Sequence, residues 1–298
     1  MKLIRLISIV MLLPAICCIA VPARSAEIVD DLGQKIVLAK PAGRIIPLYG
    51  AFAEMLFSIG AGDAVIARTQ ADVFPPELAP LPSVGTHMNP NVEMILGLKP
   101  DLVVVSASRR QESPEIARLV DSGIPVAVFS PKTFGEIFSV IERLGSISGH
   151  ERQASEFSAH LAGRLAEVRE KLGGIKTRPR VFFEIRAEPL AGAGHGSIVD
   201  EILKAAGAQN AIDGDKAIVQ YSLEALLFQD PDFYIVQQGP MNRGPAPPGQ
   251  RAHFDRLKCV REGRVLVVDE YIFSRPGPRC VDAVERLAAA LYPEKFSH

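Results

Sequence analysis

The feature that most constrains the fold of this chain is a short sequence unit that occurs twice, once in each half. In each copy a polar turn leads to a Glu, an apolar stretch follows, and a Pro-Asp pair precedes a β-like run. A unit that recurs after about 130 residues predicts two similar lobes, each with a carboxylate at a matching place. The two copies are residues 89–105, with Glu93 and Pro100-Asp101, and residues 221–236, with Glu224 and Pro231-Asp232.

Short apolar runs alternate with stretches of helical periodicity along both halves of the chain. This alternation predicts parallel sheets whose strands are joined by helical crossovers. The segment 239–249 is rich in Pro and Gly and lacks periodicity, which predicts a surface loop. The expected strands are 44–48, 65–67, 102–105, 126–129, 181–185, 233–236 and 265–268, and the expected helices are 51–59, 92–98, 114–121, 197–206, 223–228 and 280–291.

Between the two halves the pattern is helical from Phe134 to Leu172, with one break at Gly145 to Gly149. In the piece 150–172, apolar residues recur at intervals of three or four and form one stripe. At about 1.5 Å per residue this piece spans on the order of 30 Å, which is enough to bridge two lobes. We therefore predict an α/β fold of two Rossmann-like lobes joined by a long connecting α-helix, with a single doubly wound domain as the alternative. The boundaries are 27–148 for the N-terminal lobe, 149–174 for the connecting helix and 175–298 for the C-terminal lobe.

The first 26 residues have the composition of a secretory signal peptide. Lys2 and Arg5 precede an almost wholly apolar run from Leu6 to Val21, and small residues close the segment at Ala26. A membrane anchor is the alternative, but the run is short for a span. Cys17 follows Pro-Ala-Ile rather than the small residues of a lipoprotein signal, so we expect cleavage without lipidation and a periplasmic location.

The remaining composition excludes several classes of function. The formal net charge is -1, which gives no reason to expect a nucleic-acid partner. The sequence contains neither a Gly-x-Ser-x-Gly elbow nor a His-Glu-x-x-His motif, so we expect no enzyme activity, and we expect no resident cofactor. After the leader only Cys259 and Cys280 remain, and they either pair in an oxidising compartment or lie as free thiols in a core. A soluble monomer is expected.

Taken together, these motifs resemble the periplasmic substrate-binding proteins of ABC importers for iron complexes and cobalamin, the group with a rigid helix between two lobes. The resemblance extends from about Arg44 to Phe296 and rests on several weak motifs in the right order. These are Arg44-Ile-Ile-Pro-Leu48, Ala53-Glu-Met-Leu56, Gly60-Ala-Gly-Asp63, Val84-Gly85, Pro90-Asn-Val-Glu93, Leu98-Lys-Pro-Asp-Leu102, Gly123-Ile-Pro-Val126, Ser222-Leu-Glu-Ala-Leu226, Asp230-Pro-Asp232, Val260-Arg-Glu-Gly-Arg-Val265 and Ser274-Arg-Pro-Gly-Pro-Arg279.

The resemblance implies partners, because a carboxylate on each lobe of these proteins docks onto arginines of the membrane permease. The matching positions are Glu93 and Glu224, and the implied partners are an ABC permease and its ATPase. Both residues also stand at expected helix starts, where the helix dipole favours a carboxylate whether or not it docks.

The ligand of a two-lobed binder lies between the lobes, at loops that follow the carboxyl ends of strands. His87 and His195 fall in loops that look equivalent in the two halves, and either imidazole could ligate the metal of a bound chelate or only form hydrogen bonds within its loop. Arg275 could offer paired donors to a carboxylate or phosphate of the ligand. The expected ligand-facing residues are Tyr49, Phe52, Thr86, His87, Met88, His195, Tyr221, Tyr271 and Arg275.

We therefore expect a periplasmic receptor that captures a metal chelate, namely a ferric siderophore, a corrinoid or a haem, and delivers it to an importer. One alternative is a receptor for an oxyanion such as molybdate, held by backbone donors and Arg275. Another is a ligand-sensing module of the same fold that serves a sensor instead of a permease.

Overall fold

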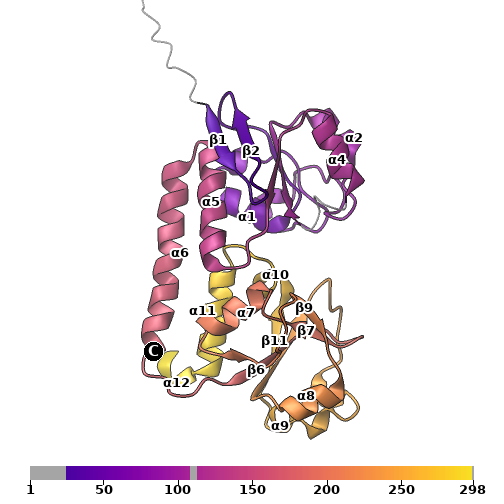
Figure 1. Cartoon of the computed structure of the whole chain (residues 1–298), viewed down its shortest axis with the longest axis vertical. Helices are drawn as coiled ribbons and strands as arrows, with labels where there is room; N and C mark the ends of the chain where they lie inside the picture. The colour runs from indigo at the N-terminus through magenta and orange to yellow at the C-terminus, as the bar shows by residue number, and fades with distance from the viewer. Residues whose placement is uncertain (1–24, 108–112, 297–298) are drawn as a thin grey trace, which may run out of the picture.

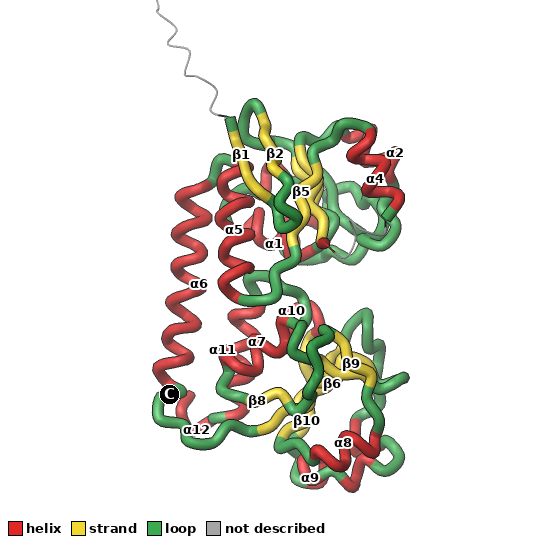
Figure 2. The backbone as a smooth tube through the Cα atoms, viewed as in Figure 1, coloured by secondary structure: helices red, strands yellow, loops and turns green. Residues whose placement is uncertain are grey.

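The computed structural model describes residues 25–107 and 113–296. It shows two lobes, one above the other, with the long helix α6 (Glu151–Lys171) along one side of both (Figure 1). The strands form two separate groups, one in each lobe (Figure 2). The predicted architecture of two α/β lobes and a connecting helix is thus confirmed. The expected signal peptide lies outside the described residues except for Ser25 and Ala26, and Ala26 is already the first residue of strand β1.

The N-terminal lobe is built on a parallel sheet with strand order β3-β4-β5. Successive strand residues point to opposite faces, so Val104 packs with α1 and α5 while Val103 and Val105 pack with α2 and α4. An antiparallel pair that we had not predicted, β1-β2, packs beside α5. The elements are β1 (Ala26–Val29), β2 (Lys35–Leu38), β3 (Ile45–Pro47), α1 (Gly50–Ser58), η1 (Gly62–Ala64), η2 (Pro76–Leu78), α2 (Val92–Leu98), β4 (Leu102–Ser106), α4 (Pro114–Asp121), β5 (Val126–Phe129) and α5 (Phe134–Ser148).

The C-terminal lobe has a mixed sheet of order β11-β10-β6-β7-β9, with β8 also paired to β6. Strands β6, β10 and β11 are parallel, whereas β7 runs antiparallel to both of its neighbours. Helices α7, α10 and α11 cover one face, and α8 and α9 cover the other. The elements are β6 (Arg180–Arg186), β7 (Ala191–Ala193), α7 (Ile198–Ala205), β8 (Gln209–Asn210), β9 (Ile218–Gln220), α8 (Leu223–Gln229), β10 (Phe233–Gln238), η3 (Pro248–Gln250), η4 (Phe254–Arg256), α9 (Lys258–Arg261), β11 (Val265–Asp269), α10 (Glu270–Phe273), α11 (Cys280–Leu291) and α12 (Pro293–Phe296).

One apolar cluster continues through the connection between the lobes. Helix α5 begins at a capping box formed by Thr133 and Glu136 and ends at Gly149, whose φ of 77° supplies the left-handed turn into α6. The apolar stripe of α6 packs on both lobes, with Ala154, Leu161 and Val168 buried in the common cluster. A chain this tightly packed along both lobes resists bending more than a pair of loops would.

Some sequence expectations differ from the structure. Residues 65–67 form only a single bridge, between Val65 and Ile45, because the segment departs from the sheet after one pairing. Cys259 and Cys280 are free buried thiols that lie in different apolar clusters, so they form no disulfide. Strands β7, β8 and β9 were not predicted, since two or three residues carry no measurable periodicity. Within the described residues, no helix has both the length and the apolar character that a membrane span requires.

Candidate functional site

The carboxyl ends of β3 and β11 meet at the boundary between the lobes. Tyr49 stands two residues after the end of β3, and Tyr271 and Arg275 follow β11. The Arg275 guanidinium lies 4.1 Å from the ring centre of Tyr271 and 5.8 Å from that of Tyr49, so it is placed between an aromatic ring of each lobe. Parallel strands bring their carboxyl ends to one edge of each sheet, which is why residues far apart in sequence converge here.

Two arginines of the C-terminal lobe pair with carboxylates of the N-terminal lobe. Arg279 binds Glu54 through two hydrogen bonds, 2.8 Å from Nε to Oε2 and 2.5 Å from Nη2 to Oε1. Arg275 makes a longer contact, 3.4 Å from Nη1 to Oδ1 of Asp72. Glu54 and Asp72 are both buried, so each carboxylate depends on its arginine partner for compensation. The Arg275–Asp72 contact is the weaker of the two by its length.

Gly50 lies directly against the contact between the lobes. A Cβ on Gly50 would lie 2.4 Å from both Nη1 of Arg275 and Oδ1 of Asp72. Any larger residue at this position would therefore push the Arg275–Asp72 pair apart.

A small cavity of about 140 Å³ lies between the lobes beside these ion pairs. Phe74 and Tyr271 line it from opposite lobes, and the Arg279 guanidinium lies 4.3 Å from the ring centre of Phe74. Three large apolar side chains in the loops of the N-terminal lobe are exposed. They are Val73 (64% exposed), Phe74 (43%) and Met88 (47%). The cleft region thus combines apolar and aromatic surface with two guanidinium groups.

Four of the residues predicted to face the ligand lie together at the cleft. Arg275 contacts the rings of both Tyr49 and Tyr271, as described, and the His87 ring lies 6.3 Å from the Tyr49 ring, centre to centre. Burial raises the pKa of Tyr49 to about 12, so its hydroxyl is protonated at neutral pH. A neutral phenol therefore lies between an imidazole and a guanidinium at the boundary between the lobes.

Three other predicted residues turn away from the cleft or serve their own loop. Phe52 is buried in the core of its lobe, where its ring packs edge-on against Tyr49 and Phe129, because it lies on the inner face of α1. The Tyr221 ring packs on Phe182 in the core of the other lobe. The Thr86 hydroxyl accepts a hydrogen bond from the Asn89 N–H within its own turn.

The expectation that His195 faces the cleft is wrong. Strand β7 runs antiparallel to β6, so its carboxyl end points to the opposite end of the sheet from that of β6. His195 lies there, 3.0 Å from Oδ1 of the buried Asp200, in a surface pocket that Arg180 and Gln229 also line. The two histidines look equivalent in sequence but are not equivalent in the structure, because the antiparallel strand β7 reverses the direction of the chain before His195.

Sequence reasoning missed several residues that build the site, namely Glu54, Asp72, Phe74, Glu270 and Arg279. A carboxylate in the middle of the apolar stretch 51–59 was a usable signal for Glu54. No sequence pattern identified its partner, since Arg279 lies 225 residues further along the chain. Within the described residues, no group of three or more His, Cys, Asp and Glu side chains is arranged to hold a metal ion.

Residues 45–271 match the sequence family described as periplasmic binding protein. The chain belongs to this family. It is 30% identical over 272 residues, 90% of this chain and 85% of the relative, to an uncharacterised ABC transporter substrate-binding lipoprotein of Bacillus subtilis, YvrC. It is 28% identical over 258 residues, 86% of this chain and 92% of the relative, to the vitamin B12-binding protein of Vibrio cholerae serotype O1. The apo form of the periplasmic heme-binding protein RhuT from Roseiflexus superposes with a TM-score of 0.76 at 23% identity, over 85% of this chain and 99% of that one.

These matches confirm the resemblance inferred from the sequence. The relatives are ABC-transporter substrate-binding proteins and other binding proteins rather than enzymes, and the family acts outside the cytoplasm.

In this periplasmic binding protein, the repeated sequence unit has the same local structure in both lobes. Helices α2 and α8 are each seven residues long, and each begins at a side chain that caps a backbone N–H, from Asn91 and Ser222 respectively. Each also ends in a left-handed residue, Lys99 or Asp230, before the proline. The two helices lie on the side of the molecule away from α6 (Figure 1).

Glu93 and Glu224 stand in the first turns of these two helices, and both are exposed. Glu93 pairs with Arg118 of α4 at 2.6 Å, with both side chains more than half exposed. An ion pair this exposed contributes little to stability and is readily exchanged for another partner. One carboxylate on each lobe is therefore accessible on the same side of the protein.

Burial shifts the protonation of two glutamates near the cleft. It raises the pKa of Glu54, although the hydrogen bonds from Arg279 act in the opposite direction. Burial likewise raises the pKa of Glu270, against the hydrogen bond that its carboxylate accepts from the Met241 N–H. Both carboxyl groups therefore hold their protons to a higher pH in the folded protein than in the unfolded chain.

We expect the free energy of unfolding to fall as the pH rises from 4.5 through the raised pKa values of Glu54 and Glu270. In that window the folded protein retains protons that the unfolded chain has released, so each group contributes a slope of at most about 1.4 kcal/mol per pH unit. In the Glu270→Gln variant, which keeps an acceptor for the Met241 N–H, the slope should be shallower. Urea unfolding between pH 4.5 and 7 measures the slope of the free energy of unfolding against pH. An unchanged slope in the variant would contradict a raised pKa for Glu270.

Proposed function

We propose that this protein captures a metal chelate between its lobes in the periplasm and delivers it to an ABC permease and its ATPase. The chelate classes are a ferric siderophore, a corrinoid and a haem. Membership of the periplasmic binding protein family supports the receptor role, and a vitamin B12-binding relative and a heme-binding structural neighbour support the class of ligand.

The observation that carries this proposal is the composition of the cleft. The Tyr49 and Tyr271 rings, one from each lobe, flank Arg275, whose bond to Asp72 is long at 3.4 Å, and the Phe74 ring lies against Arg279. A large flat or apolar chelate with an acidic group can pack on the rings and replace Asp72 as the partner of Arg275. His87, beside Tyr49, is the residue on the cleft with an imidazole to offer to a metal.

The size of the cavity sets a condition on this function. Pockets for small molecules typically enclose about 300–1,000 Å³, whereas the cavity between these lobes measures about 140 Å³. A corrinoid or haem therefore requires the lobes to part or the lining side chains to move. The Arg275–Asp72 contact would break first, because the two short bonds between Arg279 and Glu54 are stronger.

Visible absorbance titration of the mature protein with haemin, a cobalamin and a panel of ferric siderophores tests the proposal. We expect saturable binding of one of these coloured ligands, weakened about tenfold or more in Arg275→Ala through loss of a charge-assisted hydrogen bond. A His195→Ala variant is the matched control and should bind as the wild type does. A change of the metal absorption bands in His87→Ala would assign metal ligation to that residue.

An oxyanion receptor is the second candidate, because Arg275 and Arg279 at the cleft could hold a tetrahedral anion. Calorimetric binding of molybdate, together with no binding of any coloured chelate, would favour this candidate and overturn the chelate proposal. Binding of neither class would overturn both.

A further inference from the structure

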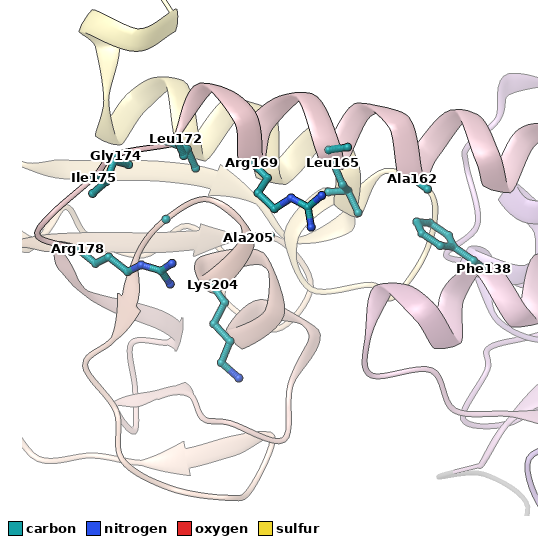
Figure 3. A pocket seen from close by; sticks show the side chains of 12 residues that line it. Phe138, Ala162, Leu165, Arg169, Leu172, Gly174, Ile175, Arg178, Lys204 and Ala205 are labelled. Atoms are coloured by element: carbon teal, nitrogen blue, oxygen red, sulfur yellow. The ribbon is translucent and has the colours of Figure 1, made fainter.

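A groove larger than the cleft cavity lies against the connecting helix. It encloses about 540 Å³, between α6, the start of α5, α7 and the segment that follows α6 (Figure 3). None of its lining residues lines the cavity between the lobes. The volume falls within the range of about 300–1,000 Å³ that is typical of pockets for small molecules.

The floor of the groove is apolar. Phe138 of α5, Leu165 of α6, and Leu172 and Ile175 after it are half-buried side chains that pack on the core with one face and line the groove with the other. Burying such surface against an apolar ligand removes it from water and is favourable. Phe138 belongs to the N-terminal lobe and Ala205 of α7 to the C-terminal lobe, so a ligand in the groove would contact both lobes.

The charged side chains that line the groove are all cationic. Arg169, Arg178 and Lys204 line it, and no lining residue is acidic. Their side chains come from α6, from the segment after it and from α7 (Figure 3). Lys204 is already occupied by Asp200 at 2.6 Å and Glu201 at 3.4 Å. Among residues 25–107 and 113–296, neither Arg169 nor Arg178 is engaged in a hydrogen bond or ion pair, unlike Arg164 one turn earlier, which binds Asp282 and Glu285.

We propose that this groove binds a small amphipathic anion, such as a long-chain carboxylate, with its apolar body on the floor and its acidic head on Arg169 and Arg178. The planar guanidinium group matches the geometry of a carboxylate and forms charge-assisted hydrogen bonds with it. The charge of the groove favours an anion over a neutral or cationic amphiphile. This site is separate from the cleft and does not depend on the identity of the chelate.

Calorimetric titration of the mature protein with dodecanoate, below the concentration at which it forms micelles, tests the proposal. We expect one saturable site, with dodecanoate displacing the fluorescent anion anilinonaphthalene sulfonate from the same protein. Arg169→Ala and Arg178→Ala should each weaken binding about tenfold or more. Ala166→Phe, at an exposed position in the groove, should block binding while leaving both arginines in place. Arg152→Ala, elsewhere on α6, is the control and should bind normally.

Three results would overturn the proposal. The first is absence of saturable binding, and the second is unchanged affinity in the double variant R169A/R178A with an unchanged melting temperature. The third is binding of dodecyltrimethylammonium with the same affinity as dodecanoate, which would show that the groove does not distinguish an anion from a cation. Co-sedimentation with anionic phospholipid vesicles that requires both arginines, without binding of free dodecanoate, would assign the groove to a membrane surface instead.

Discussion

Reversing the charge of Glu93 or Glu224 is expected to abolish ligand uptake while ligand affinity stays within about twofold of the wild type. Both carboxylates are exposed, on helices that lie on the side away from α6, and neither lines the cavity between the lobes. If they dock onto arginines of the permease, an arginine in their place sets like charges against each other, at a cost of several kcal/mol. That cost corresponds to a loss of more than about 100-fold in the affinity of receptor for permease.

The measurement compares uptake by cells that carry each variant with direct titration of the purified protein. Glu167→Arg, an exposed residue of α6, makes the same change of charge elsewhere on the protein and should support normal uptake. The docking role is refuted if Glu93→Arg or Glu224→Arg loses ligand affinity and uptake returns at saturating ligand. Each lobe carries one carboxylate, and docking of both lobes would use the two charges together. We therefore expect ligand uptake to be impaired in each single variant.

Removing Arg251 is expected to lower the free energy of unfolding by about 3–5 kcal/mol, the usual cost of leaving one partner of a buried ion pair uncompensated. Its partner Glu184 lies on β6 and is wholly buried in the C-terminal lobe. Arg251 donates two hydrogen bonds to it, and Tyr234 and Asn242 donate further ones. Since a domain is stable by only about 5–15 kcal/mol, the Arg251→Met variant should lose a large share of its free energy of unfolding.

Urea unfolding of two further variants separates this cost from a general effect of losing an arginine. Arg152→Met removes an exposed pair with Glu156 and should cost less than about 1 kcal/mol. The double variant E184Q/R251M removes the buried charge as well and should recover part of the lost stability. A cost below 1 kcal/mol for Arg251→Met alone would mean that Glu184 is compensated without its arginine.

This ion pair also anchors the loop 239–251 to the sheet. Asn242 binds Glu184 and donates to the Gln237 carbonyl, and the Met241 N–H binds Glu270 at the end of β11. The segment is mostly exposed, as its Pro and Gly content predicted, yet its position depends on a buried carboxylate. Its composition carried no sign of that attachment.

Sequence periodicity was sufficient for the elements that are long or strongly amphipathic. The expected helices 92–98 and 114–121 coincide with α2 and α4, and the break at Gly145 to Gly149 separates α5 from α6. Such elements could be predicted because side-chain spacing, capping residues and left-handed glycines act locally. The strands β7 to β9, of two or three residues each, could not be predicted from the sequence, because they form through tertiary pairing rather than local preference.

By itself the sequence determined the two lobes, the helix between them and the matching carboxylates, because each of these follows from a repeat or a periodicity that local interactions enforce. It also placed Tyr49, Tyr271 and Arg275 after the carboxyl ends of strands, at the boundary where the lobes meet. Only the tertiary structure decided that Arg279 pairs with Glu54 and Arg275 with Asp72, and that His195 lies at the opposite end of the sheet. Those outcomes depend on strand direction and on contacts between residues some 200 positions apart, and nothing near either residue in the chain encodes the other.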